Sequence, residues 1–198
     1  MDNQSGQYMN GPREDNGIRM SREPIDARQS PRNVEDVCHN WRKFHQDDER
    51  RRYPWADRFV MGFPLPVWQR PFVWTEEQQK RFVLSVWSKA DIGSYMVNSW
   101  DMRDNETFVP SSNLLLDGQQ RLTTLERYLQ DSFAVDDVNG VARHWSEVPW
   151  REQRRFMTTT FTRSEVNTFD ERELRMIYDL RNFGGTPHAE CERALRPD

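Results

Sequence analysis

The feature that most constrains the fold of this chain is a short buried strand that turns directly into an amphipathic helix. Apolar residues 114–116 predict the strand, while Leu125 and Tyr128 continue the apolar face of a helix. Asp117 and Gly118 form the turn between the two elements. Such a corner presents unpaired backbone N–H groups and the positive end of the helix dipole, and both favour an anion. The sequence therefore predicts a candidate phosphate-binding corner.

The polar residues of this corner have two interpretations. Arg121 lies in the first helical turn and offers a fixed positive charge with a geometry suited to phosphate. Alternatively, Asp117 caps the helix, Gln120 completes a variant capping box, and Gly118 permits the tight turn. Capping requires neither Gln119 nor Arg121, so both interpretations stay open on this segment alone.

The composition predicts one ordered domain preceded by a disordered tail. Hydrophobic residues make up 35% of the 198 residues, and the mean hydropathy of −0.99 indicates polar, unstructured segments. Residues 1–33 are rich in Asn, Gln, Ser, Pro and Gly and are expected to be the tail, with a single domain over residues 34–198. The net charge of −4 argues against non-specific coating of nucleic acid, although it leaves room for a local basic pocket.

Several other classes of protein are disfavoured by the sequence. Cys38 and Cys191 are too few to form a disulfide framework, and the four histidines show no zinc-ligand spacing. No apolar run is long enough to span a membrane, and no signal peptide is visible. We therefore expect a cytoplasmic protein without a membrane partner and without a metal-ligand cluster.

Helical and strand patterns alternate imperfectly along the chain, which predicts an α+β fold with a small mixed sheet and flanking helices. The capping-box sequence Thr75–Gln78 opens one of the helices, and prolines at 64, 66 and 71 impose an extended loop. The expected elements besides the central strand and helix are a helix over 34–49, a strand over 58–63, a helix from 75, a strand over 92–100 and a helix from 170.

Three segments, in order, resemble one known family. They are LPVWQRPFVW at residues 65–74, DGQQRLTTL at 117–125 and IYDLRNFGGTP at 177–187. The first two are long and specific matches to motifs of the GmrSD-type restriction endonuclease N-terminal domain, and the third is degenerate. The resemblance covers about residues 58–192 and implies a ParB/sulfiredoxin-like fold.

The resemblance implies a nucleotide-binding domain that hydrolyses or senses nucleoside triphosphates and couples this to DNA nicking or cleavage in phage defence. It also places Gln69 and Arg70 beside the corner, in a polar pocket walled by Trp68, Phe72 and Trp74. The structural alternative is that Arg70 forms a salt bridge with Asp117 and only attaches the loop to the helix.

The leading hypothesis assigns each polar residue a role toward a nucleoside triphosphate, with Mg²⁺ as a further candidate cofactor. Backbone amides near Gly118, together with Arg70 and Arg121, would hold phosphates, and Asp117 would hold Mg²⁺ or a ligand hydroxyl. The candidate catalytic residues are Asp117, Gln119 and Arg121. The candidate nucleotide-binding residues are Gln69, Arg70, Gly118, Gln120, Thr123 and Asn182.

Two alternatives stay open beside this hypothesis. One is a catalytically inactive module that binds DNA or a DNA-cleaving partner protein, which the acidic net charge and the lack of a recognisable nuclease motif favour. The other is metal-dependent DNA nicking through Asp117. Bacterial cells are the expected setting, with the chain encoded by a host or a phage, and a homodimer around the nucleotide is a further implication of the resemblance.

Overall fold

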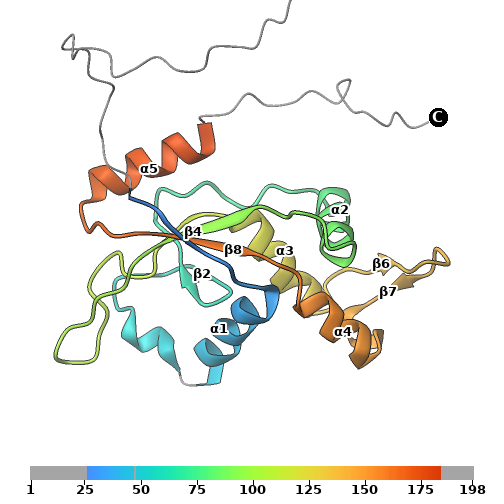
Figure 1. The fold of residues 1–198 in the computed structure, drawn as a ribbon. Helices are drawn as coiled ribbons and strands as arrows, with labels where there is room; N and C mark the ends of the chain where they lie inside the picture. Colours follow the sequence, from blue (N-terminus) through green and yellow to red (C-terminus); the bar gives the residue numbers. More distant parts are fainter. Residues whose placement is uncertain (1–25, 47, 184–198) are drawn as a thin grey trace, which may run out of the picture.

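A four-stranded mixed sheet lies at the centre of the computed structural model, which describes residues 26–46 and 48–183 (Figure 1). The strand order is β1 (Arg28–Ser30), β8 (Thr162–Val166), β4 (Ser94–Asn98) and β5 (Leu115–Asp117). The central pair β4 and β8 is parallel, and each outer strand is antiparallel to its neighbour. The predicted α+β class with a small mixed sheet is confirmed, whereas the ParB-like detail stays a prediction.

Helices cover both faces of this sheet. Those on one face are α1 (Val34–Gln46), α2 (Glu76–Trp87), α3 (Gln119–Leu129) and α4 (Trp150–Met157), and α5 (Glu171–Phe183) covers the other (Figure 1). The short elements are the 3₁₀ turns η1 (Glu49–Arg52) and η2 (Trp145–Glu147) and the hairpins β2–β3 (Phe59–Val60, Phe63–Pro64) and β6–β7 (Val135–Asp136, Ala142–Arg143). Within the described residues, none of the helices is long and apolar enough to cross a membrane.

Successive side chains of each strand point to opposite faces of the sheet, so the buried apolar residues form two clusters, one on each face. In β4, Tyr95 and Val97 point into the larger cluster with α1 to α4, while Met96 points into the smaller cluster beside α5. Leu174 and Ile177 of α5 pack into that smaller cluster. The sheet is thus buried on both sides, and the ends of β4 and β5 meet α3 on one face and α5 on the other.

Two sequence-based boundaries need correction. Residues 28–30 were expected in the tail, but they form β1 because their backbone pairs with β8, which needs no apolar signal. The strand expected over 58–63 is instead the tight hairpin β2–β3, since Met61 (φ 48°) and Gly62 (φ 82°) adopt left-handed backbone conformations that reverse the chain. Residues 1–25 of the expected tail and 184–187 of the third motif lie outside the described residues.

Candidate functional site

The predicted strand-to-helix corner is present, and a glycine forms it. β5 ends at Asp117, Gly118 has φ 101°, and α3 begins at Gln119. A Cβ atom on Gly118 would lie 2.8 Å from the Tyr95 Cβ and 3.2 Å from the Tyr95 Cα. Only glycine therefore allows the N-terminus of α3 to approach β4 this closely.

Of the capping interpretation, the role of Gly118 in the tight turn is confirmed, but the capping roles of Asp117 and Gln120 are wrong. The N-cap residue of α3 is Gly118, which has no side chain to accept a capping hydrogen bond. Asp117 is the last residue of β5, and its Oδ1 accepts a hydrogen bond from the Gly118 N–H at 2.7 Å. The other member of the proposed capping box, Gln120, directs its side chain to a different segment.

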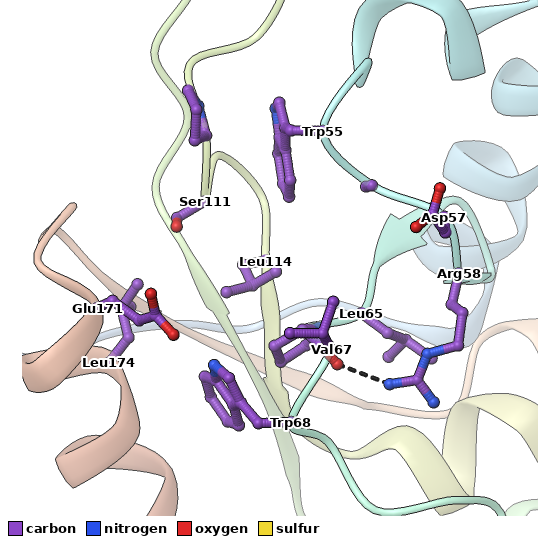
Figure 2. A pocket seen from close by; sticks show the side chains of 13 residues that line it. Trp55, Asp57, Arg58, Leu65, Val67, Trp68, Ser111, Leu114, Glu171 and Leu174 are labelled. Carbon is purple, nitrogen blue, oxygen red and sulfur yellow. Dashed lines mark hydrogen bonds between the residues drawn. The ribbon is translucent and has the colours of Figure 1, made fainter.

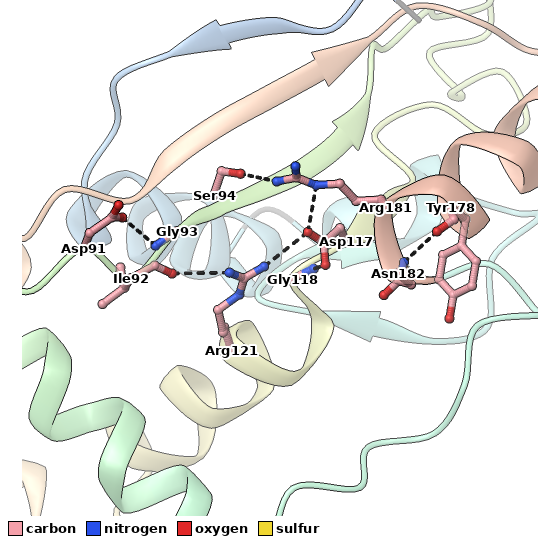
Figure 3. Close-up of polar contacts among 10 residues, drawn as sticks. All are labelled: Asp91, Ile92, Gly93, Ser94, Asp117, Gly118, Arg121, Tyr178, Arg181 and Asn182. Atoms are coloured by element: carbon pink, nitrogen blue, oxygen red, sulfur yellow. Dashed lines mark hydrogen bonds and ion pairs between the residues drawn. The ribbon is translucent and has the colours of Figure 1, made fainter. Parts of the chain in front are cut away.

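Asp117 instead lies between two arginines (Figure 3). Its Oδ2 accepts hydrogen bonds from Arg121 Nη2 and from Arg181 Nε, each at 3.2 Å. Arg121 Nη1 also donates to the Ile92 carbonyl at 3.3 Å, and Arg181 donates to the Ser94 hydroxyl. The carboxylate thus fixes two guanidinium groups that come from helices on opposite faces of the sheet.

Arg181 is a site residue that the sequence analysis missed. The alternative that paired Arg70 with Asp117 is wrong, because Arg181 occupies that role from 64 residues further along the chain. The third motif contained Arg181, but nothing in a sequence spacing shows which of several arginines reaches a given carboxylate.

Arg121 is held in a confined environment. Burial lowers the pKa of Arg121, the neighbouring Asp117 raises it, and the positive charge of Arg181 lowers it further. The group stays protonated because a guanidinium does not lose its proton in proteins. A Cβ on Gly93 would lie 2.6 Å from Arg121 Nη1, so that glycine also provides the space for this side chain.

Gln120 connects the corner to the facing proline-rich loop. Its Oε1 accepts hydrogen bonds from the backbone N–H groups of Val73 at 2.9 Å and Trp74 at 3.2 Å, and its Nε2 donates to the Pro71 carbonyl at 3.1 Å. The Thr75–Gln78 capping box, confirmed in the structure, fixes the same loop at the start of α2. These contacts give Gln120 a structural role and hold residues 69–74 over the corner.

The loop and the corner enclose a polar cavity of about 170 Å³. The residues that line it are Gln69, Arg70, Trp74, Asp117, Gly118, Gln119, Gln120, Arg121 and Asn182. Every predicted site residue is therefore brought together except Thr123, which lies on α3 but does not line the cavity. Of the three expected aromatic walls, only Trp74 is in place, since Trp68 and Phe72 lie elsewhere.

Three side chains around the cavity have no partner in the described part of the chain. Gln69 and Gln119 are each only 6% exposed, and their Oε1 atoms are buried without a hydrogen bond. Arg70 is exposed and forms no ion pair among the described residues. The lining residues carry a formal charge of 2 − 1 = +1, from Arg70 and Arg121 against Asp117, on a chain of net charge −4. Arg181, which binds Asp117 without lining the cavity, raises the formal charge around it to +2.

A second cavity of about 380 Å³ lies beside residues 65–68 of the same loop (Figure 2). It is mainly apolar, and its walls include Trp55, Val67, Trp68 and Leu174. It shares none of its lining residues with the polar cavity. Trp68 therefore belongs to this cavity, where its ring lies 5.0 Å from that of Tyr178.

The residues of the polar cavity do not fit a protein-held metal ion. Asp117 is the only carboxylate among its lining residues, and the hydrogen bonds of two arginines and one backbone N–H already engage it. Among the residues that the structure describes, no group of three or more His, Cys, Asp or Glu side chains is arranged to hold a metal ion.

Comparison with known proteins places these features in one family. The chain matches the family described as GmrSD restriction endonuclease, N-terminal domain, over residues 48–187. That span contains the proline-rich loop, the corner and α5, which are the three segments that build the polar cavity. No curated protein and no solved structure gives a significant match.

Proposed function

Because the chain belongs to the family of GmrSD restriction endonuclease N-terminal domains, we propose that its polar cavity binds the phosphates of a nucleoside triphosphate during DNA restriction. One observation supports this proposal most strongly. Two buried glutamines, Gln69 and Gln119, line a cavity of net positive charge, and their side-chain Oε1 atoms have no hydrogen-bond partner among the described residues.

The free energy of these unpaired amides favours a ligand. A buried polar group without a hydrogen bond costs about 1–3 kcal/mol, and such groups are uncommon in folded proteins. The NH₂ groups of Gln69 and Gln119 can donate to phosphate oxygens, and so can the guanidinium of Arg70. The first N–H groups of α3 have no acceptor within the helix and add further donors. An anion would accept hydrogen bonds from these donors, whereas the buried Oε1 atoms, which only accept, would need a donor on the ligand, such as a hydroxyl or a Mg²⁺-bound water.

The volume of the cavity decides which part of a nucleotide enters it. About 170 Å³ is below the roughly 300–1,000 Å³ of pockets that enclose a whole small-molecule ligand. A phosphate group fits, whereas a complete nucleoside triphosphate does not. We therefore propose that the phosphates enter toward Arg121, while the sugar and base lie outside, beside Trp74.

Hydrolysis of the nucleotide would depend on the positioning of its phosphates and on stabilisation of their charge, rather than on a metal ion held by the protein. Phosphoryl transfer needs its phosphate oxygens fixed and its developing charge stabilised, and Arg70, Arg121 and Gln119 supply such groups. We assign Asp117 to orienting Arg121 and Arg181, because its hydrogen bonds leave it poorly placed as a metal ligand. Any Mg²⁺ would enter already bound to the phosphates.

The same engagement of Asp117 favours a second candidate, a module that binds the nucleotide without hydrolysing it. A base that activates water needs a free acceptor, and Asp117, the only carboxylate among the described residues that line the cavity, is shared between two arginines. Such a module would regulate a DNA-cleaving partner protein. Phosphate release by the purified chain, measured with and without DNA, separates the two candidates.

The direct test of the cavity is a thermal-shift measurement with ATP, GTP, CTP and UTP, each with Mg²⁺. Arg70→Ala is the sharpest variant, because Arg70 is exposed and forms no ion pair with any described residue, so its loss should leave the unliganded melting temperature unchanged. We expect at least one nucleotide to stabilise the wild type and the Arg70→Ala variant to lose most of that shift. Arg103→Ala, which removes another exposed arginine without an ion pair in the described chain, is the matched control. An equal shift in wild type and Arg70→Ala would overturn the assignment of the cavity.

A further inference from the structure

Helix α4 presents an exposed basic ridge whose residues take no part in the polar cavity. The helix packs into the core through Phe156, which is fully buried. On its outer side, Trp150 is 64% exposed, and Arg151, Arg154 and Arg155 are also exposed. Arg154 and Arg155 follow Arg151 by three and four residues, which places both on the same face of the helix as Arg151.

Most of this positive charge is not neutralised by ion pairs among residues 26–46 and 48–183, which the structure describes. Arg155 pairs with Glu152 at 3.5 Å, but Arg151 and Arg154 form no ion pair in the described part of the chain. Arg151 instead lies over the Trp150 ring, 5.9 Å from its centroid. Lys89, from the end of α2, reaches the same area and donates to the Thr158 hydroxyl.

The charge of this surface opposes that of the whole chain. We call Lys89, Trp150, Arg151, Arg154 and Arg155 the α4 ridge. With Glu152 counted against its four basic residues, the α4 ridge has a formal charge of 4 − 1 = +3, although the chain as a whole has −4. A local excess of arginine on an acidic protein is the electrostatic footprint expected of a surface that contacts a polyanion.

We propose that the α4 ridge contacts the phosphodiester backbone of duplex DNA. The rise of an α-helix places Arg154 and Arg155 about 4.5 and 6 Å beyond Arg151, and phosphates of one DNA strand follow every ~3.4 Å of duplex axis. Extended arginines can therefore reach successive phosphates. The choice of DNA among polyanions rests on the proposed function in DNA restriction. Duplex is favoured over single strand because single-strand sites use a groove with several aromatic platforms, whereas Trp150 is the single aromatic residue of the ridge.

The position of the α4 ridge keeps it separate from the polar cavity. The Phe156 ring contacts the Tyr128 ring at 5.8 Å, so α4 lies beside the C-terminal part of α3. The cavity lies at the N-terminal end of α3, beside Gln119, about 14 Å away along the helix axis at 1.5 Å per residue. The ridge and the lining of the cavity share no residue, so each site can be tested by substitutions that leave the residues of the other intact.

The test is fluorescence anisotropy of a labelled 20-base-pair duplex, titrated with the full chain at salt concentrations from 50 to 200 mM. The variant is Arg151→Ala/Arg154→Ala, and the matched control is Arg103→Ala/Arg172→Ala, which removes two exposed arginines without ion pairs in the described chain. Each lost phosphate contact should reduce the slope of log affinity against log salt by about 0.9. We therefore expect the α4 variant to lose about 1.8 in slope and to bind roughly tenfold or more weakly at 50 mM salt.

Two further measurements distinguish DNA binding by the α4 ridge from nucleotide binding by the polar cavity. Arg151→Lys/Arg154→Lys keeps the charge and should retain most of the slope. Nucleotide-dependent thermal stabilisation should be the same in the α4 variant as in wild type. Unchanged duplex affinity in the α4 variant, an equal loss in the control, or a loss confined to single-stranded DNA would each overturn the proposal. So would a wild-type chain with no measurable duplex binding at 50 mM salt.

Discussion

The β5–α3 corner and the loop that faces it contribute polar residues to the same cavity in opposite ways. At the corner, Asp117 and Gln120 each accept two or more hydrogen bonds from the protein itself. On the loop, Gln69 and Arg70 have no partner among the described residues. The corner is therefore mostly used for folding, and the loop offers free groups to a ligand.

Two neighbouring residues of the corner differ in the same way, one serving the fold and the other left free for a ligand. Gln119 and Gln120 are adjacent in α3 and are equally buried, at 6% exposure each. The Gln120 side chain holds the loop with three hydrogen bonds, whereas the side-chain Oε1 of Gln119 has none among the described residues. The continuous motif at residues 117–125 thus contains residues that serve the fold and residues that are free for a ligand. Single substitutions can distinguish the two kinds.

The largest effect is expected from Gly118→Ala, which tests whether the corner is primarily structural. The new Cβ would force an alanine to φ 101° and place it 2.8 Å from the Tyr95 side chain. We expect the free energy of unfolding to fall by about 3–5 kcal/mol, measured by urea denaturation. Gly140→Ala is the matched control, because Gly140 also has a positive φ but nothing lies within 4 Å of its Cβ position. That control should cost only about 1 kcal/mol, and equal losses in the two variants would contradict the role of close packing against β4.

The next largest effect should separate the two glutamines. Gln120→Ala removes the acceptor of two backbone N–H groups, Val73 and Trp74, and should lower the free energy of unfolding by about 2–3 kcal/mol. Gln119→Ala removes a side chain without a hydrogen bond and should cost less than about 1 kcal/mol. Urea denaturation of both variants gives the comparison directly. If Gln119→Ala were as destabilising as Gln120→Ala, the division of the motif would fail.

Arg181→Ala should have a smaller effect on stability and a clearer effect on binding. The Arg181 side chain is 38% exposed, and half-exposed ion pairs contribute only about 0.5–1 kcal/mol. Its removal lowers the formal charge around the cavity from +2 to +1, so the thermal shift with nucleotide should decrease. Arg172→Ala, an exposed arginine of the same helix without an ion pair in the described chain, should change neither quantity. A normal nucleotide shift in Arg181→Ala would show that Asp117 needs only Arg121.

Local patterns predicted the corner well, because they depend on residues close together in the chain. The apolar run at 114–116 and the helical spacing of Leu125 and Tyr128 identified β5 and α3 correctly. The Thr75–Gln78 capping box was also correct, since a box needs only four residues. The cavity itself followed from the resemblance, which brought the loop and the corner together.

Contacts between distant segments were not predictable in the same way. That Arg181 rather than Arg70 pairs with Asp117 depends on how α5 crosses the sheet, which no spacing reveals. The edge strand β1 is held by backbone hydrogen bonds to β8, so its polar side chains gave no strand signal. Which glutamine would be free was equally hidden, because the answer depends on the path of the loop after Pro71.

The smallest effect on stability, and the sharpest test of the loop, is expected from Gln69→Leu. Gln69 is 6% exposed and its Oε1 has no hydrogen bond, so the wild type already carries the cost of a buried unpaired amide. A leucine of similar size removes that cost, and the free energy of unfolding should stay the same or rise by up to about 1 kcal/mol. The thermal shift with nucleotide should nevertheless decrease, because a donor to the phosphates is lost. Gain of stability with loss of binding is the signature of a residue kept for a ligand, whereas a loss of more than about 1 kcal/mol would show that Gln69, like Gln120, serves the fold.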